Sequence, residues 1–322
     1  MLTIWSNTEF SGDPLAALTA GIKPHNLIFP GERSASSLAV AGPDSALDGA
    51  DVAFGQPDPA SVMNSPRLRW VHLTSAGYTR YDTDEFRNAV SARGMVVTNS
   101  SSVYAEPCAE HALAFMLAHA RSLGAARDMQ RIDHSWDTMP LRAGSRLLLR
   151  QSVVMLGFGA IGRRLAELLS PFFVKITAMR RNPTGMEGIP VVSEAGLFHA
   201  LAGADHVVNL LPDNAGTRRF ITAEMFAAMK PQTVFYNIGR GTTVDQDALL
   251  ANLRSGHLAG AYLDVTDPEP LPPSHGLWTE PRCFITPHTA GGFDTELDSL
   301  ARHFLDNFRR YLSGSALNDR VM

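Results

Sequence analysis

The segment Gly157-Phe158-Gly159-Ala160-Ile161-Gly162 constrains the fold more than any other part of this chain. It follows the apolar run Ser152–Leu156 and precedes a helical pattern, Arg163–Leu169. In such a strand–turn–helix, the first glycine permits a tight turn and the second lets the backbone approach a pyrophosphate. The third allows the helix to pack closely on the strand. The helix N-terminus then offers unpaired N–H groups to the phosphates. The segment therefore predicts a dinucleotide-binding loop, with a simple glycine turn as the alternative.

Short apolar runs lie on both sides of this loop, separated by helical or turn-rich segments. Continuous apolar runs are typical of parallel strands that are buried on both faces of a sheet. After the loop, the predicted strands are Lys175–Met179, His206–Leu211, Thr233–Ile238, Gly260–Val265 and Cys283–Thr286. Before it, they are Leu2–Trp5, Asn26–Phe29, Asp51–Phe54, Leu68–Leu73 and Met95–Val97. The pattern predicts an α/β protein with the dinucleotide loop in a doubly wound parallel sheet.

Two further helices are predicted. Ala105–Arg121 is rich in Ala, Leu and Met, with Pro107 in its first turn, where proline is tolerated. This helix is apolar almost all round, so we expect it to be buried between domains or subunits, with His111 as a hydrogen-bonded core histidine. Thr295–Leu312 carries its apolar residues on one face at helical spacing.

Composition narrows the class of protein. A chain of 322 residues fits two domains, and its formal net charge of -4 argues against a nucleic-acid or membrane-surface partner. The start Met1–Ser6 lacks the pattern of a signal peptide, and the longest apolar stretch is too short to span a bilayer. Cys108 and Cys283 lie in apolar segments, so we expect free thiols in a reducing cytoplasm.

The residues that follow the second predicted strand of the dinucleotide-binding sheet, Lys175–Met179, indicate which cofactor is preferred. NAD-binding domains usually carry an Asp or Glu there for the ribose 2′-hydroxyl, but this sequence has Met179-Arg180-Arg181-Asn182-Pro183. A guanidinium pairs with the 2′-phosphate of NADP and offers no acceptor to ribose hydroxyls. We therefore expect NADP to be preferred over NAD, with a solvated arginine pair as the alternative. Because cells keep NADP largely reduced, this preference favours carbonyl reduction.

Three polar residues follow strands of the same sheet: Arg240, Glu269 and His288. Their segments, Asn237–Gly241, Asp264–Pro272 and Ile285–Gly291, resemble in order and spacing the D-2-hydroxyacid dehydrogenase family, in its glyoxylate/hydroxypyruvate reductase-like branch. The resemblance extends along the whole chain. Ser75-Ala76-Gly77 resembles the family's substrate loop, and Ala109–Leu113 resembles its long interdomain helix.

The resemblance implies an oxidoreductase that transfers a hydride between NADP(H) and a small 2-oxo or 2-hydroxy acid. His288 would donate the proton, since histidine exchanges protons near neutral pH, and Glu269 would stabilise its imidazolium. Arg240 would hold the substrate carboxylate and polarise the carbonyl. The N–H groups of Ala76 and Gly77, next to Ser75, would bind the other carboxylate oxygen. Taken singly, Glu269 could be a solvated loop acid and Arg240 a plain surface cation.

The same resemblance implies the set of residues that contact the cofactor. Asp264 would contact the nicotinamide carboxamide. The whole set is Gly157, Phe158, Gly159, Ala160, Ile161, Gly162, Arg180, Arg181, Leu211, Pro212, Ile238, Gly239, Asp264 and His288. Nothing in the sequence suggests a metal site. Asp213-Asn214 stands where many relatives have Leu-Thr. Tyr104 and Ser100–Ser102 also differ from the family's pattern, and these differences could alter the pocket.

We expect a Rossmann-type sheet, residues 103–286, inserted into a flavodoxin-like substrate domain, residues 1–102 plus 287–322. Crossings near Ser101 and Pro287 would form a hinge for closure over the cofactor. The apolar helix favours a homodimer, and Trp136 and Arg142 could border the site or a subunit contact or simply pack.

The same resemblance argues against two related kinds of enzyme. The chain ends soon after its last helix, so we expect no regulatory domain of the phosphoglycerate dehydrogenase kind. Glu269 argues against the formate dehydrogenase branch, which has Gln at that position. The alternatives left open are a non-enzymatic NAD(P)-sensing interaction protein of the same fold and a dehydrogenase of another small anion such as phosphite.

Overall fold

A computed structural model of the chain describes residues 1–33, 36, 39 and 41–322, with the side chain of Asp133 left out. The chain forms two compact units, Met1–Tyr104 with Gly292–Met322, and Ala105–Gly291. We predicted the crossings after residues 102 and 286, a few residues earlier in each case.

The first unit is a five-stranded parallel sheet in the order β2-β1-β3-β4-β5. Its strands are β1 (Thr3–Trp5), β2 (Asn26–Ile28), β3 (Val52–Gly55), β4 (Trp70–Leu73) and β5 (Val96–Thr98). Its helices are α1 (Gly12–Gly21), α2 (Pro59–Asn64), α3 (Asp84–Ala92) and α11 (Glu296–Ser313), with short 3-10 turns at Ser45–Gly49 and Thr79–Tyr81. All five strands coincide with predicted apolar runs.

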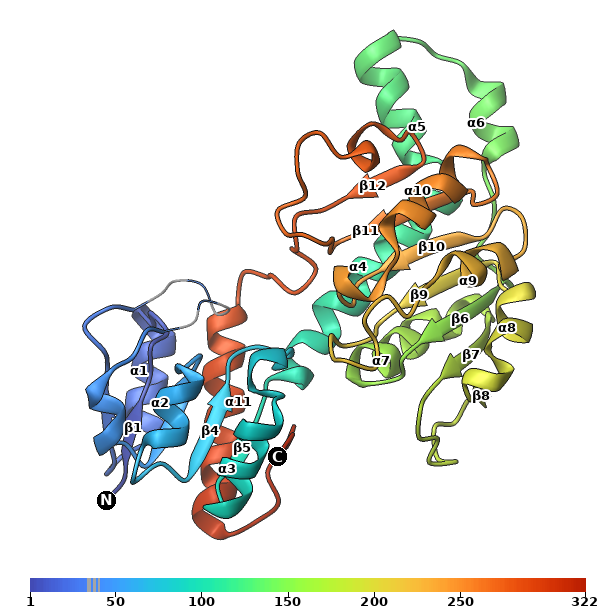
Figure 1. Cartoon of the computed structure of the whole chain (residues 1–322). Helices are drawn as coiled ribbons and strands as arrows, with labels where there is room; N and C mark the ends of the chain where they lie inside the picture. Colours follow the sequence, from blue (N-terminus) through green and yellow to red (C-terminus); the bar gives the residue numbers. More distant parts are fainter. Residues whose placement is uncertain (34–35, 37–38, 40) are drawn as a thin grey trace. The chain divides into compact units, whose positions relative to one another are not determined.

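Helices cover both faces of this sheet (Figure 1). On one face α11 packs beside α1, and Phe304 stacks on Phe54 with 4.2 Å between ring centres and on Trp70 with 5.3 Å. On the other face, residues of α2 and α3 such as Val62 and Phe86 join one core cluster with Val71. Because both faces are buried, the strands are apolar throughout rather than alternating.

The second unit is a seven-stranded sheet, all parallel, in the order β12-β11-β10-β9-β6-β7-β8. Its strands are β6 (Ser152–Leu156), β7 (Lys175–Met179), β8 (Val191–Val192), β9 (His206–Asn209), β10 (Val234–Asn237), β11 (Gly260–Leu263) and β12 (Cys283–Ile285). Its crossover helices are α7 (Ala160–Leu169), α8 (Glu194–Ala202), α9 (Ala223–Ala228) and α10 (Gln246–Arg254). Short 3-10 turns lie at Ser170–Phe172, Gly241–Thr243 and Gly276–Thr279. The strand order reverses at β6, where ligands of doubly wound sheets bind.

Helix α4 (Ser101–Ala120) begins a full turn before the helix we predicted, so Pro107 lies inside it and not in its first turn. Two hydrogen bonds to the first turn explain the early start. The Ser101 N–H donates to Asn99 Oδ1 at 3.2 Å, and the Ser102 N–H donates to Asp319 Oδ2 at 2.8 Å. These acceptors satisfy N–H groups that the first turn of a helix leaves free.

An arm of residues 121–149 follows α4 and stands off the sheet of the second unit (Figure 1). It contains α5 (Leu123–Asp128), a π-helical turn (Met129–Asp133) and α6 (Thr138–Gly144). Neither α5 nor α6 has a buried residue, and the side chain of Trp136 between them is 96% exposed. The described side chains of α5 and α6 therefore form no buried core.

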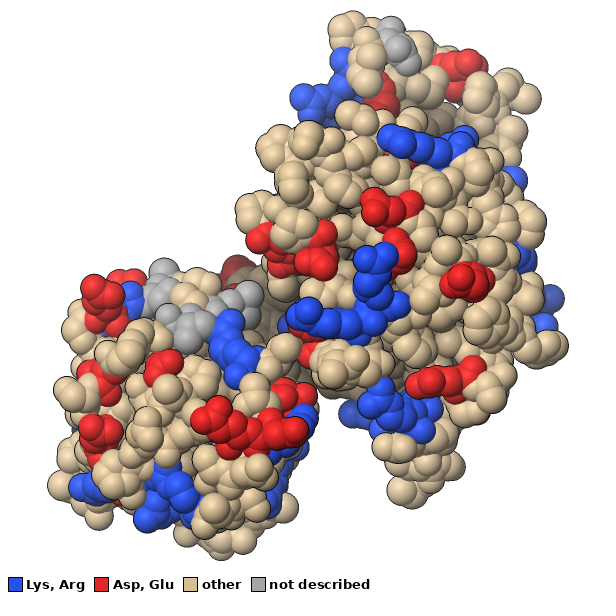
Figure 2. All heavy atoms as spheres, viewed as in Figure 1, with Lys and Arg blue, Asp and Glu red and all other residues tan. Residues whose placement is uncertain are grey.

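Charged side chains of both signs lie on the surface of the protein (Figure 2). On the face shown in Figure 2, Lys and Arg side chains are interspersed with Asp and Glu. Within the described part of the chain, none of the helices combines the length and the apolar character of a membrane span. The described residues also contain no cluster of His, Cys, Asp and Glu suited to a metal ion.

Two buried histidines predict how stability depends on pH. Burial lowers the pKa of His72 well below its usual value and lowers that of His206 to about 4. Both rings therefore stay neutral in the folded chain while the unfolded chain takes up protons below about pH 6.5. The free energy of unfolding should fall as the pH drops from about 6.5 toward 4, by about 1.4 kcal/mol per pH unit for each histidine.

Urea unfolding at a series of pH values measures this slope. A His206→Asn variant should lose the part of the slope that His206 contributes, whereas His199→Asn, on the surface helix α8, should keep the slope of the wild type. Equal slopes in all three proteins would contradict the assignment.

Candidate active site

The glycine loop has the backbone that a dinucleotide requires. Gly157, directly after β6, has φ +97, and a Cβ atom there would lie 3.1 Å from the Leu210 carbonyl oxygen. A Cβ on Gly162 would lie 3.1 Å from the Phe158 ring, so the third glycine allows close packing. Gly159 faces open space and starts α7 without a side-chain cap. The first N–H groups of α7 are thus available to an anion, and the residues present fit a pyrophosphate.

A cavity of about 370 Å³ lies in front of this loop. Its lining includes seven of the predicted cofactor residues, namely Gly157, Phe158, Gly159, Arg180, Arg181, Leu211 and Pro212. It also includes Asn182, Glu194, Asn214 and Thr217, which we did not predict. Ala160, Ile161, Gly162, Ile238, Gly239, Asp264 and His288 do not line it.

Each of the two arginines that follow β7 donates one side-chain hydrogen bond to a described residue. Arg180 Nη1 donates to Glu187 Oε1 at 2.9 Å, and Arg181 Nη2 donates to the Gly216 carbonyl at 3.2 Å. Glu187 also accepts hydrogen bonds from the N–H and hydroxyl of Thr184, which folds the 184–187 turn around it. A guanidinium has five N–H donors, so both side chains retain donors for a phosphate. Sequence reasoning missed Glu187, because no motif marks it.

His288 and Glu269 form a hydrogen-bonded pair. His288 Nδ1 lies 2.8 Å from Glu269 Oε2, and the Thr266 N–H holds Glu269 Oε1 at 3.1 Å. Burial alone would raise the pKa of Glu269, but the hydrogen bond and charge of His288 lower it below its usual value. An ionised carboxylate at Nδ1 favours the tautomer with the proton on Nδ1 and stabilises the imidazolium. Such a ring can act as a proton donor or acceptor through Nε2.

Asp264, at the end of β11, holds the loop that carries His288. Its Oδ1 accepts from the Thr286 hydroxyl at 2.6 Å and the Thr289 N–H at 2.8 Å, and its Oδ2 accepts from the Ala290 N–H at 3.0 Å. Its backbone carbonyl accepts the His288 N–H at 2.8 Å. His288 has φ +54, which is uncommon for a residue other than glycine and persists only where the surroundings hold it. The carboxamide contact expected of Asp264 stays a prediction.

His111 joins the same network, where we expected a hydrogen-bonded core histidine. Its Nε2 lies 3.1 Å from the Thr286 hydroxyl and 3.8 Å from Asp264 Oδ1. Burial lowers the pKa of His111, and the nearby Asp264 carboxylate partly offsets this. The ring is therefore neutral at physiological pH and supports Thr286.

Arg240 lies in a loop pressed against two neighbouring strand ends. A Cβ on Gly239 would lie 2.7 Å from the Leu211 carbonyl oxygen, and a Cβ on Gly241 would collide with the Thr266 carbonyl. These close approaches bring the Arg240 loop beside the loop of Glu269, and the charge of Arg240 lowers the pKa of Glu269 further. Arg240 Nη1 donates to the Gly239 carbonyl at 2.7 Å, which leaves other donors of the guanidinium for an anion.

The loop Thr74–Gly77 follows β4 in the first unit. The Ser75 carbonyl accepts the Ser100 N–H at 3.0 Å, and the Gly77 carbonyl accepts the Ser75 hydroxyl at 2.5 Å. Gln56 Nε2 donates to the Ser75 hydroxyl oxygen at 2.9 Å. The N–H groups of Ala76 and Gly77 have no partner among the described residues. Such an array of N–H groups suits an anion.

Comparisons with known proteins agree with this chemistry. Residues 113–290 match the NAD binding domain of the D-isomer specific 2-hydroxyacid dehydrogenases. The chain is 38% identical over 195 residues to an uncharacterized protein from Corynebacterium melassecola, a match that spans 60% of this chain and 63% of that protein. It is 31% identical over 256 residues to the glyoxylate reductase/hydroxypyruvate reductase of Mus musculus, over 78% of this chain and 76% of that protein.

A solved structure agrees over the full length. A D-isomer specific 2-hydroxyacid dehydrogenase from Xanthobacter autotrophicus Py2, in complex with NADPH and MES, matches with a TM-score of 0.81 and 26% identity, over 100% of this chain and 98% of that one. The chain therefore belongs to the D-isomer-specific 2-hydroxyacid dehydrogenase family of NAD(P)-dependent oxidoreductases that act on CH–OH groups.

Proposed function

We propose that this protein reduces a small 2-oxo acid, of the glyoxylate or hydroxypyruvate type, with NADPH. The hydrogen-bonded pair of His288 and Glu269 carries the proposal, because it supplies a proton donor of the kind carbonyl reduction needs. The relatives named as glyoxylate or hydroxypyruvate reductases support the choice of substrate class.

In this mechanism the protein residues bind and orient the substrate and supply the proton. The residues of the glycine loop would hold the cofactor, which would supply a hydride to the carbonyl carbon of the substrate. His288 donates a proton from Nε2 to the oxygen that becomes an alkoxide, and Glu269 stabilises the imidazolium before the transfer. Arg240 pairs with the substrate carboxylate and polarises the carbonyl oxygen. Asp264 accepts hydrogen bonds from the N–H groups of Thr289 and Ala290 and so holds the backbone of His288 at its positive φ.

Initial rates of NADPH oxidation with a panel of 2-oxo acids test the proposal, with His288→Ala as the decisive variant. Loss of the proton donor should lower kcat by about a hundredfold to ten-thousandfold, while the Kd for NADPH stays unchanged. Glu269→Gln should also lower kcat, because an amide stabilises an imidazolium less than a carboxylate does. Full activity of the His288 variant would overturn the mechanism.

A matched control for these variants is Glu167→Gln, an exposed acid on α7 that pairs with Arg164. Its rates and pH profile should equal those of the wild type. A wild-type protein that binds NADPH tightly yet reduces no member of the panel would instead favour the non-enzymatic sensor.

The preference for NADPH over NADH is part of the same proposal. Arg180 and Arg181 line the cavity of the glycine loop, and the solved relative from Xanthobacter autotrophicus was crystallised with NADPH. Hydrogen bonds to charged groups contribute about 1.5–3 kcal/mol. Arg180→Gln should therefore weaken NADPH binding by about tenfold to a hundredfold and leave NADH binding nearly unchanged. Fluorescence titration of both cofactors measures this.

The control for the cofactor experiment is Arg309→Gln, an exposed arginine on α11. It should change neither Kd. Equal weakening of NADPH and NADH in the Arg180 variant would remove the basis for the preference.

We also propose that the arm of residues 121–149 forms a homodimer contact. Ile132, Trp136 and Met139 are 73%, 96% and 71% exposed, and monomeric proteins rarely leave such groups of large apolar side chains uncovered. Trp136→Asp should shift the protein toward monomer in sedimentation velocity. Phe173→Asp, at an exposed apolar residue outside the arm, should keep the assembly of the wild type, and an unchanged sedimentation profile in both variants would refute the contact.

A further inference from the structure

The loop Thr74–Gly77 is held by all four of its carbonyl groups. The Ser75 and Gly77 carbonyls accept the bonds described above. The Thr74 carbonyl lies 2.8 Å from the Tyr104 hydroxyl, and the Ala76 carbonyl accepts Asn99 Nδ2 at 2.6 Å. In a trans peptide the C=O of one residue and the N–H of the next point in opposite directions. The group that holds the Ala76 carbonyl therefore sets the direction of the Gly77 N–H.

Asn99 is itself fixed on every side. It is 3% exposed at the end of β5. Its backbone N–H donates to the Asp319 carbonyl at 3.0 Å, and its Oδ1 accepts the Ser101 N–H at 3.2 Å. Only its Nδ2 is directed at the loop, so the side chain cannot turn without losing a bond at each end.

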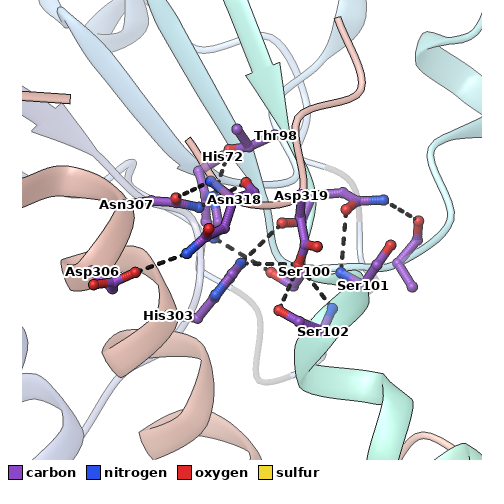
Figure 3. Close-up of polar contacts among 12 residues, drawn as sticks. His72, Thr98, Ser100, Ser101, Ser102, His303, Asp306, Asn307, Asn318 and Asp319 are labelled. Atoms are coloured by element: carbon purple, nitrogen blue, oxygen red, sulfur yellow. Dashed lines mark hydrogen bonds and ion pairs between the residues drawn. The ribbon is translucent and has the colours of Figure 1, made fainter. Parts of the chain in front are cut away.

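A cluster of polar residues from the C-terminal segment supports this arrangement (Figure 3). Asp319 Oδ2 accepts the Ser102 N–H at 2.8 Å and the Ser102 hydroxyl at 2.6 Å, and it lies 3.3 Å from His303 Nε2 on α11. Burial alone would raise the pKa of Asp319, but the bonds from His303 and Ser102 lower it below its usual value. The carboxylate stays ionised and keeps the start of α4, with Asn99, in place.

We propose that Asn99 is a positioning residue for the substrate carboxylate. Its amide turns the Ala76–Gly77 peptide so that the Gly77 N–H faces the anion. This inference rests on the proposed function, in which the loop binds one carboxylate oxygen of a 2-oxo acid.

The variant Asn99→Asp tests the proposal because it keeps the size of the side chain and replaces the donor with an acceptor. A carboxylate there repels the Ala76 carbonyl and turns the peptide. The KM for the 2-oxo acid should rise by about tenfold or more, with a smaller change in kcat and no change in the Kd for NADPH. A contact made equally in the ground state and the transition state is seen in KM.

The pH dependence of this variant separates positioning from general damage. Burial raises the pKa of a carboxyl group, so the introduced group becomes protonated as the pH falls and can then donate to the Ala76 carbonyl. The titratable residues beside this position are Asp319, whose backbone carbonyl accepts the Asn99 N–H at 3.0 Å, and His303, whose Nε2 lies 3.3 Å from the Asn99 carbonyl oxygen. The ratio of KM between variant and wild type should fall toward one as the pH is lowered from about 8 to about 5.5.

Asn307→Asp is the matched control. Asn307 is fully buried in the same cluster, and its Nδ2 donates to the Asn318 carbonyl at 3.1 Å, away from the loop. This variant should lose stability without the rise in KM. An equal rise in KM in both variants, or a KM of Asn99→Asp equal to that of the wild type, would overturn the proposal.

Two further outcomes are decisive. If Asn99→Asp does not fold, Asn99→Ala must show the same split between KM and kcat, without the reversal at low pH. If the wild type reduces no 2-oxo acid, the proposed function fails, and Asn99 is then judged by the Ala76–Gly77 peptide in crystal structures of wild type and variant. If the Ala76–Gly77 peptide has the same orientation in the variant as in the wild type, the inference is overturned. A changed orientation in the variant supports it.

Discussion

Backbone segments from neighbouring strands approach so closely at the carboxyl edge of the seven-stranded sheet that only glycine fits between them. Gly157 lies against the Leu210 carbonyl, Gly239 against the Leu211 carbonyl, and Gly241 against the Thr266 carbonyl. These contacts join the ends of β6, β9, β10 and β11 into one surface. A side chain on Gly241 would push apart the loops that carry Arg240 and Glu269, and side chains on Gly157 or Gly239 would push the neighbouring loops away from the end of β9.

Asp264 organises the other half of that surface. Its carboxylate accepts hydrogen bonds from Thr286, Thr289 and Ala290. These bonds hold His288 in a backbone conformation that favours glycine. The imidazole then lies within hydrogen-bond distance of Glu269 at Nδ1. One buried acid thus holds the loop that carries the ring, and a second, half-exposed acid contacts the ring itself.

Much of this could be predicted from the sequence, because the features concerned are local. The strands are apolar runs, the dinucleotide loop is a glycine pattern, and Arg240, Glu269 and His288 follow strand ends in a recognisable order. Strand β8 was missed because two valines carry no periodicity. The early start of α4 was missed because its first turn is capped by Asp319, which is distant in sequence.

The other contacts that the sequence did not predict have the same physical origin. Glu187 acts on Arg180 through the fold of its own turn, and Asn99 acts on Ala76 across two strand ends. The hydrogen bond expected of His111 is present, but its neighbours Thr286 and Asp264 lie on other segments and could not be named from the sequence. Side-chain contacts between segments far apart in sequence leave no pattern that spacing or composition can reveal.

The two units also differ in how their sequences are laid out along the chain. The second unit is one continuous segment, whereas the first is assembled from residues 1–104 and 292–322. During synthesis the dinucleotide-binding unit can fold as soon as it has left the ribosome. The loop at Ser75–Gly77 must wait until α11 and Asp319 emerge, nearly the whole chain later. The dinucleotide-binding unit is thus built first, and the unit that holds the Ser75–Gly77 loop is completed last.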